Sequence, residues 1–457
     1  MRKGFAFPHS KQRSRRTLRE RQTVIWERRQ PQVRDGGAEH AIMSLSLSET
    51  IKQRALETGF DLAGVAPPGV WQDLEFSRQW VEAGYGGEMA YLANPKRHDP
   101  RRVLPSVQSV VCVALVYNAP EPYSTEVEQT GIGAISKQPG ESRAWISRYA
   151  WGKDYHEVMR TRLEQLRKEI ETLAPEAGTR VYVDTGPIVE RAFARYSGMG
   201  WTGKNTCLIN EGKGSWFFLG VILTNLVIQP DLPAADRCGS CTRCLEACPT
   251  GALVKPYVMD ASRCIAYLTI ELKGSIPEPL RAAVGSNVFG CDICQDVCPW
   301  NSPRANGSPA AVTGCRRGAA TTNLPEFQPL EIETGGLENS HAEATGSAGG
   351  LTPDTSHLTP SLSRVSLFAP LLQALASLSE QDFRRAFSRS PVKRAKYRGW
   401  LRNLCVAMGN SADREFIPWL ERASKHADPA VREHAGWALG RLRKTALPEG
   451  VNRRAHR

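Results

Sequence analysis

Eight of the twelve cysteines lie within 61 residues, and this patch constrains the fold more than any other feature of the chain. It opens with "CGSCTRCLEACPTGA" from Cys238 and closes with "CDICQDVCPW" from Cys291. In each run a proline follows the last cysteine. Secreted disulfide scaffolds are usually small and evenly cross-linked, whereas this chain has 457 residues and one dense patch. The pattern therefore favours metal ligation in a reducing cytoplasm.

The first run has the spacing C-x2-C-x2-C-x3-C-P of bacterial two-cluster ferredoxins. In that arrangement three cysteines bind one cluster and the fourth binds the other. If the second run exchanges its last cysteine in the same way, Cys298 completes the first cluster. The second cluster then lacks a ligand, and Cys264 is the nearby candidate. We expect two [4Fe–4S] clusters, the first on Cys238, Cys241, Cys244 and Cys298, and the second on Cys248, Cys264, Cys291 and Cys294.

The alternative for this patch is a zinc ribbon, since two C-x2-C pairs can bind zinc. Eight cysteines with two Cys-Pro endings fit iron–sulfur clusters better. The four remaining cysteines are scattered, and we expect them to be ordinary residues; they are Cys112, Cys207, Cys315 and Cys405.

Helical and strand patterns alternate before the patch. Residues 155–173 place apolar side chains at steps of three and four, which predicts an amphipathic helix. Strands are predicted at "SVVCVALVYN", at "TRVYVDTG" with its end at Asp184, and at "SWFFLGVILTNLVI". This interleaving predicts an α/β layer.

The regions after the patch change character. Residues 302–365 are rich in Ser, Gly, Thr and Pro, which predicts a linker or a disordered insertion. Residues 413–442 have the helix–turn–helix pattern of a HEAT-type repeat, which must stack on the preceding helices or on the body. The predicted domains are a basic arm (1–42), an α/β domain (43–229), a ferredoxin-like module (230–301), the linker (302–365), HEAT-like helices (366–446) and a basic tail (447–457).

Charge is unevenly distributed along the chain. Residues 1–42 carry a net charge of +7 and residues 366–457 a net charge of +10, against +12 for the whole. Basic ends on an acidic body suggest that one part meets a polyanion, although a basic soluble surface would look the same. The arm is predicted to be disordered, or to precede a true start at Met43, or to be a transit peptide. Because no run of eighteen apolar residues occurs, we expect no transmembrane helix.

Several motifs together resemble the epoxyqueuosine reductases, a family related to the corrinoid reductive dehalogenases. They are "VDTGPIVERAFARYSGMGWTGKNTCLIN", "RYAWGKDYH", "KRHDP" and the two cysteine runs, and the isolated Cys264 matches as well. The resemblance covers about residues 46–301 and continues more weakly through the helical tail. The arm and the insertion at 302–365 have no counterpart in it.

The resemblance implies an enzyme that reduces epoxyqueuosine to queuosine at the wobble position of tRNA anticodons. It implies a nitroreductase-like α/β domain with bound cobalamin, which is reduced through the two clusters. It also implies an external low-potential electron donor and a monomeric, cytoplasmic protein. Positions similar to corrinoid contacts in the family are Arg97, Ser147, Asp184, Lys204, Asn205, Ser215 and Trp216. From the residues alone, Arg97 and Lys204 could equally be surface cations and Trp216 a core residue.

Asp184 matches the proton donor of the family. Opening an epoxide creates an alkoxide, so a positioned acid lowers the barrier. To act near neutral pH, the carboxyl is expected to have its pKa raised by burial beside the apolar corrin. By itself an Asp-Thr-Gly after a strand is a weak signal, because it also opens the aspartic-protease motif or caps a turn.

The stretch "PVKRAKYRGWLRN" interleaves cations with Tyr397 and Trp400. A tRNA loop is bound through phosphate contacts and base stacking. We therefore predict tRNA contacts at Lys393, Arg394, Arg398 and Arg402. The alternative is a solvated helix face with Trp400 in the core.

Two other functions fit parts of the sequence. A ferredoxin fused to helical repeats would carry electrons only, but it would leave the α/β region before the patch unexplained. A corrinoid reductive dehalogenase would be exported with a twin-arginine signal; "SRRTLRERQ" has an arginine pair, but no apolar segment follows it.

Overall fold

The computed structural model describes five segments, and the predicted arm and basic tail lie outside them. The chain divides into two units, Met1–Ser46 and Leu47–Arg457, and the elements below belong to the second unit. The described segments are 46–69, 72–129, 141–301, 319–334 and 363–444. Within these segments no helix combines the length and the apolar character needed to cross a membrane.

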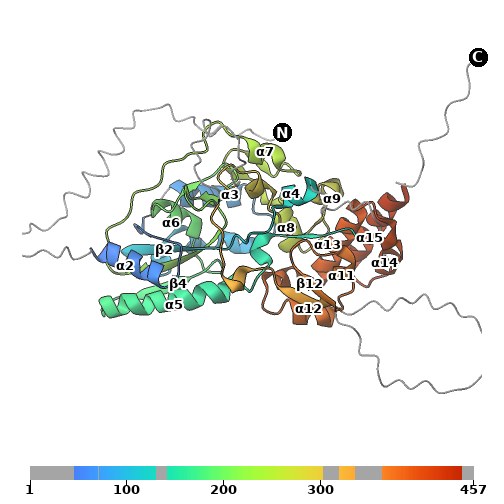
Figure 1. Ribbon diagram of the computed structural model, residues 1–457. Coiled ribbons are helices and arrows are strands. Elements are labelled where there is room, and N and C mark those ends of the chain that lie inside the picture. Colours follow the sequence, from blue (N-terminus) through green and yellow to red (C-terminus); the bar gives the residue numbers. More distant parts are fainter. Residues whose placement is uncertain (1–45, 70–71, 130–140, 302–318, 335–362, 445–457) are drawn as a thin grey trace, which may run out of the picture. The chain divides into compact units, whose positions relative to one another are not determined.

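A four-stranded sheet forms the centre of the first half (Figure 1). Its strand order is β1–β2–β7–β4, and every neighbouring pair is antiparallel. The longest pairing joins β2 to β7 from Ser109 opposite Thr224 to Val116 opposite Phe217. The strands are β1 (Leu62–Ala66), β2 (Ser109–Val116), β7 (Phe217–Thr224) and β4 (Thr179–Tyr182).

Helices cover both faces of this sheet, because β2 is apolar on both sides. Val111 and Val113 pack toward α5, whereas Val110 and Ala114 pack toward α6, as the two-residue period of a strand requires. The predicted α/β layer is thus confirmed as a mixed α/β arrangement. The covering helices are α2 (Leu47–Glu57) and α5 (Tyr155–Leu173) on one face and α3 (Gln72–Glu82) and α6 (Glu190–Tyr196) on the other.

The cysteine-rich module consists of short elements. Its strand β10 (Asn287–Phe289) pairs in parallel with β3 (Trp145–Ile146) of the preceding region, so the two predicted domains share a small sheet. The other elements are α7 (Arg243–Ala247), β8 (Leu253–Lys255), β9 (Val258–Met259), α8 (Ile265–Ile270), α9 (Glu278–Val284) and α10 (Ile293–Asp296). Shorter elements of the first half are α4 (Ser124–Gln129), β5 (Trp201–Thr202) and β6 (Leu208–Ile209).

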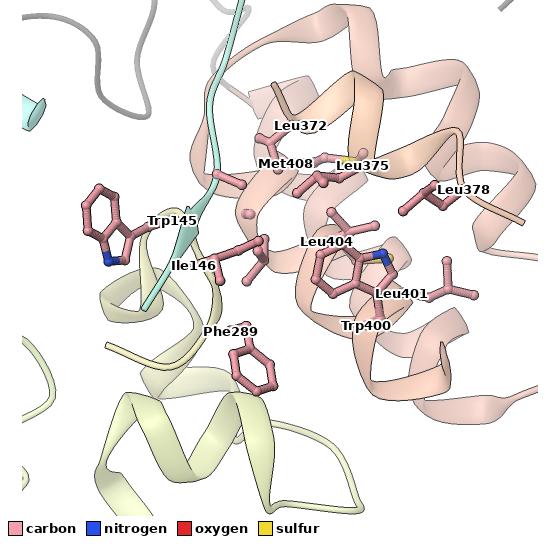
Figure 2. Packing of buried hydrophobic residues seen from close by; sticks show 14 of the residues in the cluster. Trp145, Ile146, Phe289, Leu372, Leu375, Leu378, Trp400, Leu401, Leu404 and Met408 are labelled. Atoms are coloured by element: carbon pink, nitrogen blue, oxygen red, sulfur yellow. The ribbon is translucent and has the colours of Figure 1, made fainter. Parts of the chain in front are cut away.

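Five helices follow, and their core continues into the module. Figure 2 shows Trp400 and Leu404 packed in the same cluster as Ile146 and Phe289. The predicted face of residues 431–442 is buried against α13, as stacking requires. The helices are α11 (Leu372–Ala376), α12 (Glu380–Ala386), α13 (Lys396–Asn410), α14 (Ile417–Ala423) and α15 (Pro429–Lys444).

Part of the predicted linker at 302–365 is ordered structure. Strands β11 (Glu331–Thr334) and β12 (Ser363–Ser366) pair with each other, and Phe327 and Ile332 are buried in the two main cores. The linker prediction is therefore wrong for residues 319–334, because their few apolar side chains are core residues. The Ser- and Gly-rich remainder lies outside the described residues.

Candidate active site and cluster centres

The thiols of the first predicted ligand set come from the two cysteine runs and lie near one another. Cys241 and Cys238 lie close to Cys244; burial and these two thiols raise the pKa of Cys244 to about 11. Burial, together with the nearby Cys238 and Cys244, raises the pKa of Cys298 to about 12. Helix α7, which holds Cys244, contacts α10, which precedes Cys298. The exchange of the last cysteine between the two runs thus matches the positions of these thiols.

The second predicted set comes together in the same way. Burial and the nearby Cys248 raise the pKa of Cys264, and burial and the nearby Cys264 raise the pKa of Cys291. Cys294 has both Cys291 and Cys264 as neighbours. Cys264 therefore lies where the missing fourth ligand was predicted.

The surroundings of these sulfur atoms suit thiolates that bind iron. The backbone N–H of Ala252 donates a hydrogen bond to Cys248 Sγ at 3.3 Å. The backbone N–H groups of Ala266 and Tyr267 point at Cys264 in the same manner. The indole Nε1 of Trp201 lies beside Cys238 and, among the described residues, has no nitrogen or oxygen partner. Donors that point at thiolate sulfur are the environment that iron–sulfur clusters need, so the residues present fit two clusters.

Cys207 occupies a position that the sequence did not reveal. It is a hydrogen-bond partner of Cys294, and it also lies near Cys264 and Cys298. This ninth thiol is therefore between the two ligand sets rather than in an ordinary core. Cys112 and Cys405 are buried in apolar cores as expected, and Cys315 lies outside the described residues.

Three predicted cofactor contacts reach across to the cysteine module. Lys204 Nζ donates to the carbonyls of Gly239 and Cys241 at 2.7 and 2.9 Å. Asn205 Nδ2 donates to the carbonyl of Cys294 at 3.1 Å. Ser215 Oγ donates to Gln295 Oε1 at 2.8 Å. These side chains hold the loops that carry the predicted ligands.

Two further predicted contacts are buried. Ser147 Oγ donates to Asp292, which also accepts from Trp145 Nε1 at 3.0 Å. Trp216 is fully buried and packs in the core between the sheet and α5. Both side chains are buried in the described part of the chain, and their role as pocket residues stays a prediction. Asp292 is buried and joins Ser147 and Trp145 to the cysteine module.

Asp184 lies just beyond β4 with φ at +49°, a left-handed conformation that is unusual outside glycine. The turn continues through Gly186, where a Cβ atom would lie 2.4 Å from the ring of Tyr182. Arg97, from the 3₁₀ helix Pro95–His98, donates to the carbonyl of Gly186 at 2.8 Å. The structure thus joins Arg97 to the turn that carries Asp184 through the backbone of Gly186.

Two residues of α5 contact the carboxylate of Asp184. Tyr155 Oη donates to Oδ2 at 2.8 Å, and Nε2 of His156 lies 3.4 Å from the same oxygen. Burial by itself would raise the pKa of Asp184, but these two groups outweigh it and the pKa is lowered. The expectation of a raised pKa is therefore wrong, because it took account of burial and not of a cationic neighbour.

His156 is held between two carboxylates. Its Nδ1 lies 2.7 Å from Asp154 Oδ1, and its ring stacks on Tyr155 at 4.1 Å. Burial favours the neutral imidazole, but Asp154 and Asp184 together raise the pKa of His156 to about 9. His156 is thus a cation at neutral pH. The sequence carried a signal for it only within "RYAWGKDYH".

Two predicted tRNA contacts lie beside this site. Lys393 Nζ pairs with Asp154 Oδ2 at 2.8 Å, and Arg394 pairs with Glu271 at 2.8 Å. Both cations are close to half exposed, and Arg394 is near enough to Asp184 to lower its pKa. The 3₁₀ helix Pro391–Ala395 therefore brings positive charge to the rim of the Asp184 site.

The other two predicted tRNA contacts, Arg398 and Arg402, differ in exposure. Arg398 is about half exposed and lies 3.5 Å from Asp428. Arg402 is 2% exposed, and its guanidinium donates to backbone carbonyls inside the protein. Its prediction as a phosphate contact is wrong, because α13 turns this side chain inward. Trp400 is fully buried and Tyr397 donates to the carbonyl of Leu378, so the alternative of a core aromatic holds for Trp400.

Comparison with known families agrees with the cluster centres. Residues 237–301 match the family described as "4Fe-4S double cluster binding domain". Residues 97–185, which end one residue after Asp184, match "Epoxyqueuosine reductase QueG, DUF1730". Fold and centres together define an iron–sulfur oxidoreductase with two [4Fe–4S] clusters.

Relatives named epoxyqueuosine reductase match most of the chain. The one from Xanthomonas campestris is 36% identical over 392 residues, covering 85% of this chain and 94% of the relative. The one from Synechocystis is 39% identical over 340 residues, covering 73% of this chain and 95% of the relative. The chain belongs to the epoxyqueuosine reductase family.

Solved structures of epoxyqueuosine reductases are similar as well. One with an epoxyqueuosine-modified tRNA-Tyr stem loop has a TM-score of 0.65 at 28% identity, covering 87% of this chain and 90% of that one. One from Streptococcus thermophilus has a TM-score of 0.66 at 26% identity, covering 88% and 91%.

Proposed function

We propose that this protein reduces epoxyqueuosine to queuosine at the wobble position of tRNA, with electrons delivered through two [4Fe–4S] clusters to cobalamin. Family membership supports the reaction, and a related structure holds a tRNA stem loop with the modified base. One observation carries the proposal on this chain. The predicted proton donor Asp184 is half exposed and shares its site with the cations Lys393 and Arg394.

The ligand sets belong to this proposal. Cys238, Cys241, Cys244 and Cys298 would hold the first cluster, and their mutual proximity supports this. The second cluster would be held by Cys248, Cys264, Cys291 and Cys294. An external low-potential donor would supply the electrons.

Cobalamin would bind beside Asp184. Burial raises the pKa of Glu190 to about 7, and both Asp184 and Arg97 lie near it. In the described part of the chain, Oε1 of Glu190 has no hydrogen-bond partner although it is buried. A ligand with amide groups, such as a corrin, would supply that partner, so the residues present fit the group. When bound, a reduced corrin supplies the low-potential electrons that open the epoxide.

The residues of this chain then have separate tasks. Lys393, Arg394 and Arg398 would hold tRNA phosphates, whereas Arg402 would support the fold. Asp184 would donate a proton to the epoxide oxygen as its carbon–oxygen bond breaks. The helices within residues 366–446, α11 to α15, would be HEAT-like repeats. The α/β domain would be nitroreductase-like, and the protein would act as a cytoplasmic monomer.

Nucleoside mass spectrometry of tRNA tests this function. A strain that lacks the gene should accumulate epoxyqueuosine, and the restored gene should convert it to queuosine. Asp184→Ala should fail to restore queuosine. The control Glu164→Gln, which removes an exposed carboxylate elsewhere on α5, should succeed. Normal queuosine in the strain without the gene would refute the proposal.

A further inference from the structure

Reduction of an epoxide to an alkene consumes more protons than one carboxyl holds. Both carbon–oxygen bonds break, two electrons enter from the reductant, and two protons join the oxygen, which leaves as water. Asp184 can carry one proton at a time. If the proposed function is correct, Asp184 must therefore be reprotonated within each turnover, while the modified base fills the site.

The two oxygens of Asp184 are not equivalent. Oδ2 accepts from Tyr155 at 2.8 Å and lies 3.4 Å from Nε2 of His156. Oδ1 has no hydrogen-bond partner among the residues that the structure describes. A proton can thus reach Oδ2 from the protein, while Oδ1 remains open to a substrate.

His156 is built into α5 in a fixed orientation. Asp154 caps the helix by accepting from the backbone N–H of His156 at 3.1 Å, and the same Oδ1 lies 2.7 Å from the ring Nδ1. The ring of Tyr155 is stacked between His156 at 4.1 Å and Phe218 at 4.2 Å. With Nδ1 engaged by Asp154, the imidazole must direct Nε2 toward Asp184.

We propose that His156, oriented by Asp154, is the positioning residue that reprotonates Asp184. Both protons of each epoxide reduction then pass through the Asp184 carboxyl. For each proton, Nε2 of His156 first donates to the ionised carboxylate of Asp184 at Oδ2, and the neutral carboxyl then donates a proton to the substrate oxygen. The imidazole then regains a proton from solvent; its side chain is 23% exposed, while the Nε2 atom itself is buried. No electrons move in this step.

The charge balance around the pair keeps the proton on His156 until the substrate oxygen, a stronger base, draws it through Asp184. At neutral pH the proton resides on His156, whose pKa is about 9, and the carboxylate of Asp184 is ionised. Arg394 also favours the ionised carboxylate, and Lys393 offsets part of the charge of Asp154. Arg389 neutralises the neighbouring Glu157 at 2.8 Å. The other titratable groups near Asp184 are Tyr91, Tyr149 and Glu190.

The test compares the pH dependence of queuosine formation on epoxyqueuosine tRNA by the holoenzyme and three variants. His156→Gln removes the imidazole that holds the proton. Asp154→Asn removes the negative charge at position 154 while keeping a residue that caps helices well. Glu164→Gln is the control on the same helix. Deuterium exchange at the imidazole C2 position, followed by mass spectrometry, reports the protonation of His156 without reference to activity.

In the wild type and the control, kcat should stay level through neutral pH and fall only above about pH 9, and C2 exchange of His156 should have the same midpoint. His156→Gln should lower kcat about 10- to 100-fold near pH 8 with KM for tRNA unchanged, and this deficit should grow with pH. In Asp154→Asn both the kinetic break and the exchange midpoint should move to lower pH together.

If the wild type forms no queuosine, the proposed function fails and the relay fails with it. If the wild type is active but His156→Gln has a profile of the same shape, lowered uniformly or not at all, the relay alone is refuted. A kinetic break in Asp154→Asn that stays in place while the exchange midpoint moves would refute it as well.

Discussion

Arg402 offers a sharp test, because the sequence and the structure assign it opposite roles. Its guanidinium donates to the carbonyls of Leu268, Leu272 and Gly274 at 2.6, 2.8 and 2.6 Å. These carbonyls lie in the last turn of α8 and just after it, and α8 begins next to Cys264. Burial lowers the pKa of Arg402 to about 10, so the side chain is still a cation at neutral pH.

Arg402→Ala should therefore destabilise the protein. A hydrogen bond to a charged group contributes about 1.5–3 kcal/mol, and a buried carbonyl left without a partner costs about 1–3 kcal/mol. Relief from burying the guanidinium and partial access of water to two of the carbonyls offset some of this loss. We expect a net loss of about 3 kcal/mol, with Arg402→Lys losing less because it keeps the charge.

The assay is urea unfolding followed by circular dichroism and by cluster absorbance, with tRNA affinity measured at several salt concentrations below the transition. Arg402→Ala should unfold at lower urea but bind tRNA with the wild-type salt dependence. Arg398→Ala should do the reverse, with the salt slope smaller by about 0.7 to 0.9 for one lost phosphate contact. Wild-type unfolding of Arg402→Ala combined with a reduced salt slope would mean that the side chain meets RNA after all.

Three further predictions follow from the site. Cys207→Ala should lower the reduction potential of the second cluster by roughly 20–60 mV, the equivalent of one hydrogen bond to sulfur, in a redox titration with Cys405→Ala as control. Cys264→Ser should lose about half of the bound iron by elemental analysis, since one of two clusters loses a ligand. His156 has its pKa raised from 6.5 to about 9 despite burial, so its stabilisation is complete below pH 6.5 and is lost as the pH rises through about 9. The free energies of unfolding of wild type and His156→Gln should therefore differ by up to roughly 3 kcal/mol at low pH, and the difference should vanish above about pH 9.

Features that depend on residues close together in the sequence, such as cysteine spacing and helix periodicity, were the ones predicted most fully. Spacing alone grouped the eight predicted cluster cysteines in two sets, and the thiols of each set are neighbours in the structure. The helix at 155–173 has the predicted ends, because its apolar period is uninterrupted. The strand directions could not be predicted, because β2 is apolar on both faces and such a run suits parallel and antiparallel sheets alike.

Long-range contacts limited the prediction of the site. Lys393, Arg398 and Arg402 look alike in one basic stretch, and only the packing of α13 separates an exposed cation from a buried one. The pKa of Asp184 depends on His156, which is 28 positions earlier in the chain. Burial alone gave the wrong direction, because a protonated imidazole at 3.4 Å outweighs it.

The boundary predicted at residue 229 separates two sequence patterns but not two mechanical parts. Lys204, Asn205 and Ser215 of the α/β region donate hydrogen bonds into the cysteine module, and β3 pairs with β10. Electron transfer between the clusters and a site beside Asp184 requires a fixed separation. An interface of backbone carbonyls held by buried or partly buried side chains fixes it better than a linker would. The residues that resemble cofactor contacts in the family also hold the loops that carry the predicted cluster ligands.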